Sequence, residues 1–195
     1  DARHAVLAVP PVLAKEIAYA PRLPAAKLAI LRAFVPGALT KCEAVYETPF
    51  WRAAGLSGQG VSDAGPTNTI FDNSPPDGSP GVLFGFAGGA SRAGWAALPA
   101  AERRARVLDR FAAFVGDQAR SPVDYFEQDW SKERWTRGCP VGHTGPGALT
   151  RHGPALRRPT GRIHWAGTET SDYWLGYMDG AVRAGERAAR EILGV

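Results

Sequence analysis

The positions of apolar and polar residues along the chain predict a succession of strands and helices. Short apolar or alternating runs, which suit buried or half-buried strands, occur at residues 5–9, 39–46, 67–71, 82–87, 123–130 and 162–166. Apolar residues spaced three or four apart predict helices at residues 24–32, 99–115 and 181–193. The stretch 55–81 is rich in Gly, Pro, Ser, Asn and Asp, so we expect turns around its strand. This succession predicts a mixed α/β (α+β) fold.

The last strand and the last helix are joined by a glycine-punctuated segment. Residues 167–170 (GTET) form a tight, hydroxyl-rich turn, and residues 176–180 (GYMDG) lead into the helix. A strand that passes through small residues into a helix start aims backbone N–H groups at a polar ligand. We therefore expect this segment to hold a polar cofactor.

The final helix is predicted to bury an apolar stripe and to pack closely on a sheet. The predicted stripe consists of Val182, Gly185, Ala189 and Ile192, and the charged residues left to solvent are Arg183, Arg187, Arg190 and Glu191. The small residues that would allow close packing are Gly180, Ala181, Ala184, Gly185 and Ala188. Glycine inside a helix costs ~1 kcal/mol relative to alanine, so Gly185 also suggests a packing requirement.

The composition is that of a folded globular protein and argues against several functional classes. Of the 195 residues, 45% are hydrophobic and 22% charged, and the net charge of +4 is spread along the chain rather than gathered into a nucleic-acid-binding patch. The cysteines, Cys42 and Cys139, suggest no disulfide framework and no thiolate zinc site, and the histidines have no metal-site spacing. Without a long apolar run or a signal peptide, we expect a cytoplasmic protein that does not enter membranes.

The motifs near the end of the chain resemble those of a known family. The runs at 166–170 (AGTET), 176–181 (GYMDGA) and 185–189 (GERAA) resemble the C-terminal flavin-binding signature of the flavin-dependent amine oxidases, the family of the monoamine oxidases. Residues 5–11 and 45–52 are similar to other parts of that family, so the resemblance covers essentially the whole chain. It implies part of an FAD-binding Rossmann-like domain at residues 1–30 and 133–195, and most of a mixed-sheet substrate domain at residues 31–132.

One element that FAD binding requires is not found in these residues. The adenosine half of such a site needs a Gly-x-Gly-x-x-Gly turn between a strand and a helix. The glycines at 55–60 and 85–89 are interpreted as loop glycines instead. Because the chain also begins abruptly with an apolar strand pattern, we expect it to be the C-terminal part of a longer family member. A missing N-terminal part of the flavin domain, in the same or a second chain, is therefore an expected partner.

The resemblance assigns cofactor contacts residue by residue. Trp130 would pack beside the flavin ring, and Cys139 matches the cysteine that joins FAD through a thioether in monoamine oxidases. Gly167, Thr168 and Glu169 would offer backbone and hydroxyl groups to the ribityl and phosphate portion. The start of the last helix, with Gly176, Tyr177 and Met178, would direct its positive dipole end at the flavin N1–C2=O edge.

The resemblance also assigns residues to the substrate and to catalysis. Tyr177 matches one of the two tyrosines that face the amine in monoamine oxidases, and Trp174 borders the same space. The second tyrosine of that aromatic cage is replaced by Pro140. Lys41 matches the lysine that holds a water against flavin N5, where a cation stabilises charge developing on oxygen.

These residues together predict a flavin-dependent oxidase that converts an amine to an imine, and then to an aldehyde, while dioxygen becomes hydrogen peroxide. An L-amino acid oxidase would need an arginine for the substrate carboxylate, for which Arg52 and Arg92 are candidates. A polyamine oxidase would use acidic residues such as Asp63, Asp72 and Asp77. A catalytically inactive fragment remains an alternative, and a homodimer is a further expectation.

Overall fold

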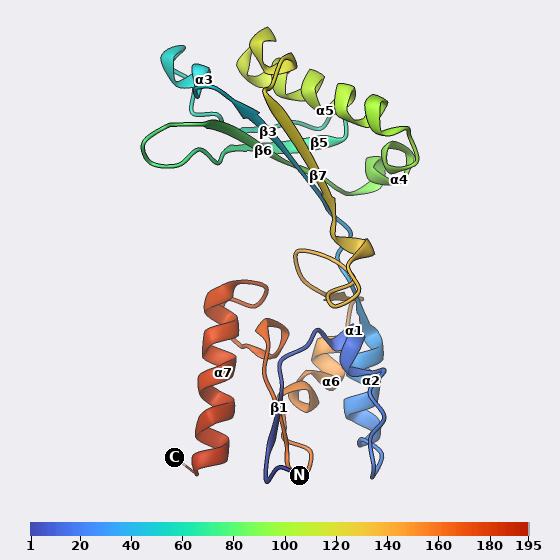
Figure 1. The fold of residues 1–195 in the computed structure, drawn as a ribbon. Coiled ribbons are helices and arrows are strands. Elements are labelled where there is room, and N and C mark those ends of the chain that lie inside the picture. Colours follow the sequence, from blue (N-terminus) through green and yellow to red (C-terminus); the bar gives the residue numbers. More distant parts are fainter. Residues whose placement is uncertain (195) are drawn as a thin grey trace. The chain divides into compact units, whose positions relative to one another are not determined.

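The computed structural model describes the backbone of residues 1–194, and the side chains of these residues except 90 and 91 (Figure 1). The chain forms a mixed α/β fold with two compact units. The first unit comprises Asp1–Gly37 and the chain from Ser131 onward, and the second unit is Ala38–Trp130. The chain therefore leaves the first unit once and returns to it.

The second unit is built on an antiparallel sheet of five strands in the order β4-β5-β6-β3-β7. Its strands are β3 (Thr40–Tyr46), β4 (Gly60–Val61), β5 (Thr67–Asp72), β6 (Gly81–Ala87) and β7 (Asp124–Asp129). Its helices are α3 (Phe50–Ala53), α4 (Ala90–Ala96), α5 (Ala100–Val115) and the 3-10 turn Asp117–Arg120. Buried and half-buried residues alternate along β3 and β6, as the period of two predicts.

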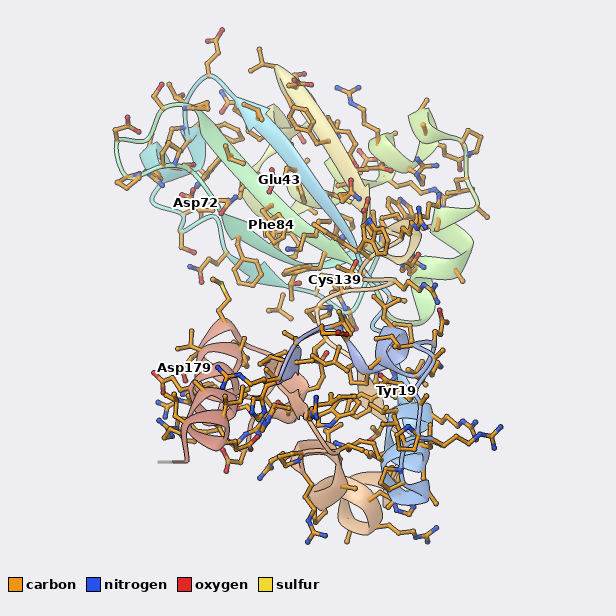
Figure 2. The ribbon with its side chains drawn as sticks, turned by 60° about the horizontal axis from the view of Figure 1, so that its bottom comes forward. Tyr19, Glu43, Asp72, Phe84, Cys139 and Asp179 are labelled. Carbon is orange, nitrogen blue, oxygen red and sulfur yellow. The ribbon has the colours of Figure 1, made fainter. Side chains whose placement is uncertain are left out.

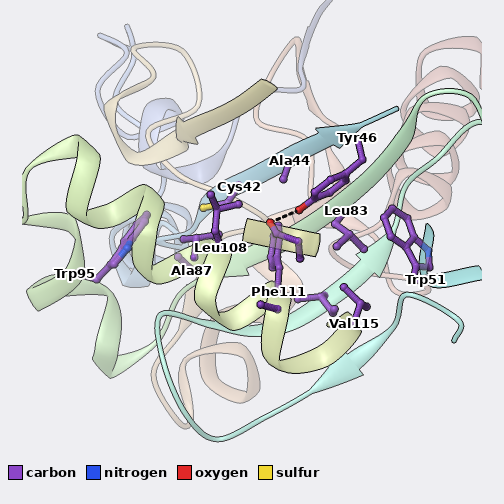
Figure 3. Packing of buried hydrophobic residues seen from close by; sticks show 14 residues of the cluster. Cys42, Ala44, Tyr46, Trp51, Leu83, Ala87, Trp95, Leu108, Phe111 and Val115 are labelled. Atoms are coloured by element: carbon purple, nitrogen blue, oxygen red, sulfur yellow. Dashed lines mark hydrogen bonds between the residues drawn. The ribbon is translucent and has the colours of Figure 1, made fainter. Parts of the chain in front are cut away.

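Helix α5 covers one face of this sheet and forms the core of the second unit (Figure 1). Phe111 of α5 is fully buried beside strand residues such as Cys42 and Leu83 (Figure 3). Burying a side chain of this size contributes roughly 1.5–3 kcal/mol. Gly85, predicted to be a loop glycine, lies inside β6, where a Cβ would approach the Phe111 ring to 2.8 Å. The loop interpretation of Gly85 was wrong, whereas the predicted strand 82–87 that contains it is present; the glycine permits close packing of helix on sheet.

The first unit combines two short sheets with several helices. Strand β1 (Ala5–Leu7) pairs in parallel with β9 (Ile163–Trp165), and β2 (Phe34–Val35) pairs with β8 (His143–Thr144). The helices are α1 (Pro11–Ala14), α2 (Ala25–Ala33), α6 (Ala148–Arg157) and α7 (Met178–Leu193). A 3-10 turn occurs at Thr168–Thr170, and another, Trp130–Lys132, begins at the last residue of the second unit, where the chain returns to the first. Ile30, Leu31, Leu156 and Trp165 belong to its buried core. None of the helices within residues 1–194 combines the length and apolar character needed to cross a membrane.

Most of the predicted elements are present, but α6 was missed. Gly153 and Pro154 lie inside this helix, and both residues usually argue against a helical interpretation. Packing of α6 against α2 buries Leu156 and offsets the unfavourable local sequence. Helix α7 also begins at Met178, before the predicted start at Ala181.

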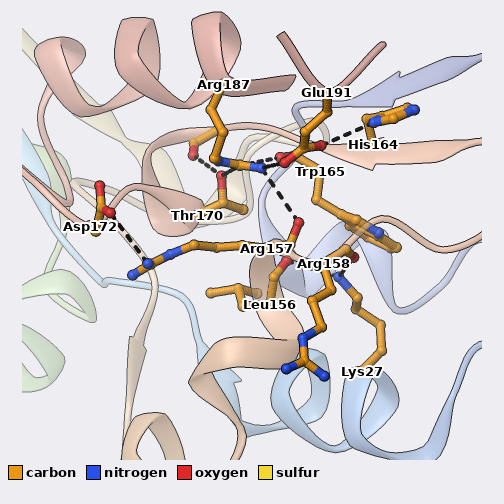
Figure 4. Close-up of polar contacts among 11 residues, drawn as sticks. Lys27, Leu156, Arg157, Arg158, His164, Trp165, Thr170, Asp172, Arg187 and Glu191 are labelled. Atoms are coloured by element: carbon orange, nitrogen blue, oxygen red, sulfur yellow. Dashed lines mark hydrogen bonds and ion pairs between the residues drawn. The ribbon is translucent and has the colours of Figure 1, made fainter. Parts of the chain in front are cut away.

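The prediction of which face α7 buries was wrong. Val182 of the predicted stripe is 60% exposed, whereas Gly180, Ala184 and Ala188 are buried, which confirms these three as close-packing residues. Arg187 is only partly exposed, because its Nη2 donates hydrogen bonds to the Trp165 carbonyl oxygen at 2.5 Å and to Thr170 Oγ1 at 3.1 Å (Figure 4).

Glu191 completes this polar packing between α7 and β9. Its carboxylate accepts from Arg187 Nη1 at 2.5 Å and contacts Nδ1 of the buried His164 at 3.0 Å (Figure 4). Although burial opposes the shift, the hydrogen bonds with His164 and Arg187 hold the pKa of Glu191 below its usual value. Hydropathy therefore misplaced the helix face, because partnered charged groups lie where apolar residues were expected.

Candidate functional site

A cavity of about 270 Å³ lies within the first unit, among segments that are distant in sequence. Its walls come from residues 8–12, 36–37, 136–142, 167–169 and the first turn of α7. Pockets for cofactors commonly have volumes of ~300–1,000 Å³, so this cavity suits part of a dinucleotide rather than the whole. The residues that line it are Ala8, Pro10, Pro11, Val12, Pro36, Gly37, Thr136, Gly138, Pro140, Val141, Gly142, Gly167, Thr168, Glu169 and Ala181.

The turn after β9 forms one wall of this cavity. Gly167 has φ +93°, a conformation that favours glycine, and a Cβ there would lie 3.3 Å from the Ala8 carbonyl oxygen. Thr168 Oγ1 donates to the Tyr177 carbonyl oxygen at 2.8 Å and accepts from the Gly176 N–H at 2.7 Å. Because this hydroxyl is engaged within the turn, the backbone is what Thr168 can offer to a ligand.

The start of α7 adjoins this turn. Tyr177 is the N-cap residue, and Ala181 in the first turn lines the cavity. A Cβ on Gly180 would lie 2.2 Å from the Trp174 carbonyl oxygen, so glycine is required for the chain to fold back against the helix. The positive end of the helix dipole, equivalent to roughly half an elementary charge, favours electron-rich ligand groups there.

The loop that carries Cys139 forms the opposite part of the wall. The Cys139 N–H donates to the Gly37 carbonyl oxygen at 3.0 Å, and the Gly37 N–H donates to the Val141 carbonyl oxygen at 3.1 Å. The Cys139–Pro140 peptide bond is cis. Gly138 and Pro140 line the cavity, whereas the half-buried Cys139 is not among its lining residues. The thiol therefore adjoins this wall without contributing to the cavity surface.

Two polar side chains in the cavity wall, those of Glu169 and Thr136, indicate that the cavity suits a polar cofactor. Glu169 is 7% exposed, and its Oε1 accepts from the Gly142 N–H at 3.4 Å. Thr136 Oγ1 is buried without a hydrogen-bond partner among the described residues and belongs to the cavity wall. A buried hydroxyl without a hydrogen-bond partner destabilises the folded protein unless a ligand or a water molecule forms a hydrogen bond with it. With the glycine walls and the helix start, these groups fit the flavin end of FAD.

Two aromatic residues of the first unit, Trp174 and Tyr177, lie in contact at the start of α7. The rings of Trp174 and Tyr177 meet edge to face, with centroids 5.3 Å apart at an angle of 78°. Trp174, Tyr177 and Met178 are 52%, 63% and 87% exposed. These side chains are therefore available for contact with a ligand.

Lys41 and Trp130 lie together in the second unit. Lys41 Nζ is 5.6 Å from the Trp130 ring centroid, and it is 5.6 Å from Phe84 and 5.9 Å from Phe86. These distances are within the range of cation–π attraction. The structure thus brings Lys41 and Trp130 together in one unit. It places Cys139, Gly167, Thr168, Glu169, Trp174, Gly176, Tyr177 and Met178 in the other.

Comparison with known proteins establishes the family. The sequence model of the family described as "Flavin containing amine oxidoreductase" matches residues 1–193. The chain belongs to this family of flavin-containing amine oxidoreductases. The resemblance that the sequence motifs carried is thereby confirmed.

Similar amine oxidoreductases come from different organisms. A Mycobacterium tuberculosis protein named as a flavin-containing monoamine oxidase, AofH, is 43% identical over 98% of this chain and 42% of its own length. An L-amino acid dehydrogenase of Synechocystis is 39% identical over 99% of this chain and 41% of its own length. A solved structure of putrescine oxidase bound to putrescine has a TM-score of 0.94 at 36% identity, covering 98% of this chain and 43% of that one. The chain therefore spans about two fifths of the length of these relatives.

The two arginines that the sequence offers as binders of an amino acid carboxylate, Arg52 and Arg92, form ion pairs with aspartates of this chain. Arg52 Nε lies 2.7 Å from Asp72 Oδ2, and Arg92 Nη2 lies 2.6 Å from Asp129 Oδ1. Asp72 also accepts from Trp51 Nε1 at 2.9 Å. Among the nominated acidic residues, Asp72 is thus committed to holding α3 on the sheet.

Sequence reasoning missed several residues that shape the cavity. Thr136 and Gly142 line it, yet neither belongs to a motif that singles it out. Gly37 was missed as well, although a Cβ there would lie 2.4 Å from the Cys139 carbonyl oxygen. The contact of Gly37 with Cys139 joins segments about a hundred residues apart, and all three residues take part in a wall built from segments distant in sequence, so no local pattern could have signalled these roles.

Proposed function

We propose that this chain is the flavin-ring and substrate-sheet portion of an FAD-dependent amine oxidase. The observation that carries the proposal is that the segments matching the family signature, 166–170 and 176–181, contribute to the wall of a cavity suited to a flavin. Residues 1–30 and 133–195 would form flavin-domain segments and 31–132 the substrate domain. The division into two compact units supports this assignment, with boundaries after Gly37 and after Trp130.

When bound, FAD would supply the redox chemistry: it would accept a hydride equivalent from the carbon that bears the nitrogen, and pass two electrons to dioxygen, which takes up two protons to give hydrogen peroxide. The amine nitrogen loses a proton, and the product is an imine. Water then hydrolyses the imine to an aldehyde and ammonia or an amine. This route requires the substrate nitrogen to be neutral when it reacts.

The residues of this chain would position the reactants. The backbone of Gly167–Glu169 would face the ribityl and phosphate portion, while Gly176, Tyr177 and Met178 at the start of α7 would stabilise negative charge on the flavin edge. Trp130 would pack beside the ring, and Trp174 and Tyr177 would orient the amine. Lys41 would hold a water and stabilise charge developing on oxygen.

The covalent bond through Cys139 remains a prediction. Its neighbours Gly138 and Pro140 line the cavity, which supports a position near the cofactor, but the thiol itself does not. Mass spectrometry after denaturation distinguishes the two cases, since a thioether keeps the flavin mass on the peptide that contains Cys139. A Gly-x-Gly-x-x-Gly part of the flavin domain is the expected partner, and assembly as a homodimer stays a prediction for sedimentation velocity to test.

The paired arginines support an amine rather than an amino acid as substrate. A carboxylate needs a guanidinium that is not already engaged, and both Arg52 and Arg92 contact aspartates of this chain. Comparison of an amine with the amino acid that carries the same side chain would test this preference. Equal oxidation of both would overturn it.

The central experiment uses the purified enzyme that carries this chain. We expect flavin absorbance bands, bleaching of those bands by an amine without oxygen, and hydrogen peroxide when oxygen is admitted. Gly185→Ala is a suitable control variant, because a Cβ there meets no atom within 4 Å. A colourless preparation that takes up no added flavin would instead support the inactive fragment.

A further inference from the structure

Arg187 of α7 joins the two ends of the turn that lines the cavity. Its Nη2 donates to the Trp165 carbonyl oxygen at 2.5 Å, before the turn, and to Thr170 Oγ1 at 3.1 Å, after it (Figure 4). The residues between these two contacts include the segment 167–169, which lines the cavity. Arg187 itself is not among the lining residues, so any effect it has on a bound cofactor passes through the turn.

Thr170 carries this contact to the backbone of the turn. Its side chain is buried, its Oγ1 donates to the Gly167 carbonyl oxygen at 2.9 Å, and its N–H donates to the same oxygen at 3.0 Å. A guanidinium group can only donate hydrogen bonds, so the Thr170 hydroxyl accepts from Arg187 and has its single proton left for another acceptor. Arg187 thereby favours the hydroxyl orientation that holds the Gly167 carbonyl.

The position of the Gly167 carbonyl decides the direction of the next N–H group. The peptide bond between Gly167 and Thr168 is trans, and in a planar trans peptide the C=O and N–H groups point in opposite directions. Because the carbonyl is turned toward Thr170, the Thr168 N–H points to the opposite side. Thr168 lines the cavity and its hydroxyl is engaged within the turn, so this N–H is the donor that it can offer to a cofactor.

Arg187 is fixed by a partner on its own helix, which leaves its Nη2 for the turn. Its Nη1 donates to Glu191 Oε1 at 2.5 Å, and the other oxygen of that carboxylate contacts His164 Nδ1 at 3.0 Å. Arg183, one turn earlier in α7, is more exposed and pairs with Asp179 of the same helix at 2.7 Å (Figure 2 labels Asp179). Arg183 is therefore a matched arginine whose ion pair stays within the helix.

We propose that Arg187 is a positioning residue for the cofactor. Acting through Thr170 and the Gly167 carbonyl, it presents the Thr168 N–H to an oxygen of the ribityl or phosphate portion of FAD. The proposal rests on the FAD-dependent function proposed above and adds to it the residues that hold the cofactor-binding turn in place.

The test measures the dissociation constant of FAD for the purified enzyme that carries this chain, from the fluorescence of released flavin. Thr170→Val keeps the side-chain shape and the charge of Arg187 but removes the hydroxyl, and should raise the constant about 5- to 10-fold. Thr170→Ser keeps the hydroxyl and should stay within about twofold. Arg187→Met should raise the constant about 10- to 100-fold, and the control Arg183→Met should change it less than about twofold.

The double variant separates positioning from a merely structural role. If Arg187 acts through Thr170, adding Thr170→Val to Arg187→Met should change the dissociation constant less than about twofold, whereas independent contributions multiply. Multiplying effects, or an unchanged constant in variants that only lower the free energy of unfolding in urea, would overturn the proposal. If Arg187→Met does not fold, equal constants for Thr170→Val and Thr170→Ser would overturn it as well.

The outcomes also separate this proposal from the proposed function. If the enzyme binds FAD and oxidises an amine but Arg187 and Thr170 do not affect FAD binding, the positioning role is wrong and the oxidase function stands. If FAD affinity depends on both residues in the non-additive manner but no amine is oxidised, the positioning role is supported and the oxidase function fails. A wild-type enzyme that binds no flavin would overturn both.

Discussion

The ammonium group of Lys27 lies 4.0 Å from the centre of the Trp165 ring, inside the core of the first unit. Its Nζ also donates to the carbonyl oxygens of Leu156 at 2.9 Å and Arg158 at 3.0 Å, at the end of α6 (Figure 4). Lys27 is 2% exposed, so a charged residue joins α2, α6 and β9 within the apolar interior. Two carbonyl oxygens and one ring face thus surround a group that usually lies in solvent.

This burial predicts a pH-dependent contribution to stability. Burial, together with the charge of Arg187, lowers the pKa of Lys27 from 10.5 to about 7. The unfolded chain therefore binds more protons between about pH 7 and 10, so this group makes the free energy of unfolding rise with pH in that window. Lys27→Met should remove this rise. The free energy of unfolding of the variant, taken relative to that of wild type, should therefore fall by about 1–2 kcal/mol between pH 7 and pH 9.

Urea denaturation at several pH values measures the free energy of unfolding of the wild type and of the variant. Because both proteins contain the other titrating groups, the contributions of those groups cancel in the difference. Lys15→Met is the control, because Lys15 is exposed and its substitution should give a difference that does not depend on pH. A difference in the free energy of unfolding between Lys27→Met and wild type that stays constant from pH 7 to 9 would contradict the prediction.

Gly180 is expected to be required for the turn beside the cavity. Alanine at this position would place its Cβ 2.2 Å from the Trp174 carbonyl oxygen, so either the turn or the helix start must move. We expect Gly180→Ala to destabilise the protein by about 1–3 kcal/mol and to lower its flavin content. Gly185→Ala is the matched control in the same helix. Because its Cβ would meet no atom within 4 Å, this variant should stabilise the protein by about 0.5–1 kcal/mol. Absorbance per protein and denaturation curves measure both effects, and equal behaviour of the two variants would refute the steric argument.

Asp72 is expected to hold the second unit together at neutral pH. Its carboxylate accepts from Trp51 Nε1, Arg52 Nε and the Ser74 N–H at 2.9, 2.7 and 2.9 Å. Although burial opposes the shift, these bonds hold the pKa of Asp72 well below 3.8. Its contribution is therefore present above about pH 4 and is lost as pH falls toward the lowered pKa.

The expected result for Asp72→Asn is a loss of about 1.5–3 kcal/mol at pH 7, because a charged acceptor of several hydrogen bonds is removed. The difference from wild type should shrink below about pH 4. The exposed Asp63→Asn serves as control and should change stability by less than about 0.5 kcal/mol. A similar loss in both variants, measured by denaturation, would show that Asp72 has no special role.

Lys41 should act on the oxygen half of the proposed reaction. Its ammonium group, held among Phe84, Phe86 and Trp130, would stabilise charge on oxygen rather than bind the substrate. Lys41→Met is expected to slow reoxidation of the reduced enzyme by about 100-fold, while reduction by the amine changes only a few-fold. Lys41→Arg, which keeps the charge, should retain a larger share of the oxygen rate. Stopped-flow absorbance follows the two half-reactions separately, and equal slowing of both would assign Lys41 a structural role instead.

Local sequence patterns were sufficient to predict elements whose formation depends on neighbouring residues alone. The alternation along 39–46 and 82–87 predicted β3 and β6, because a strand with one buried face repeats every two residues. Glycine-rich motifs at 166–170 and 176–181 predicted the turn and the helix start that line the cavity. The same motifs led to the family.

The sequence by itself therefore determined the main strands, the longest helices, the family and the residues of the turn beside α7. Tertiary structure alone decided that α7 buries Gly180, Ala184 and Ala188, and that Arg187 and Glu191 pack against β9. It also decided that Lys27 is buried and that Gly37 and Thr136 shape the cavity. The physical reason is that a charged group can be buried once backbone carbonyls from distant segments complete its hydrogen bonds, and no local pattern records those partners.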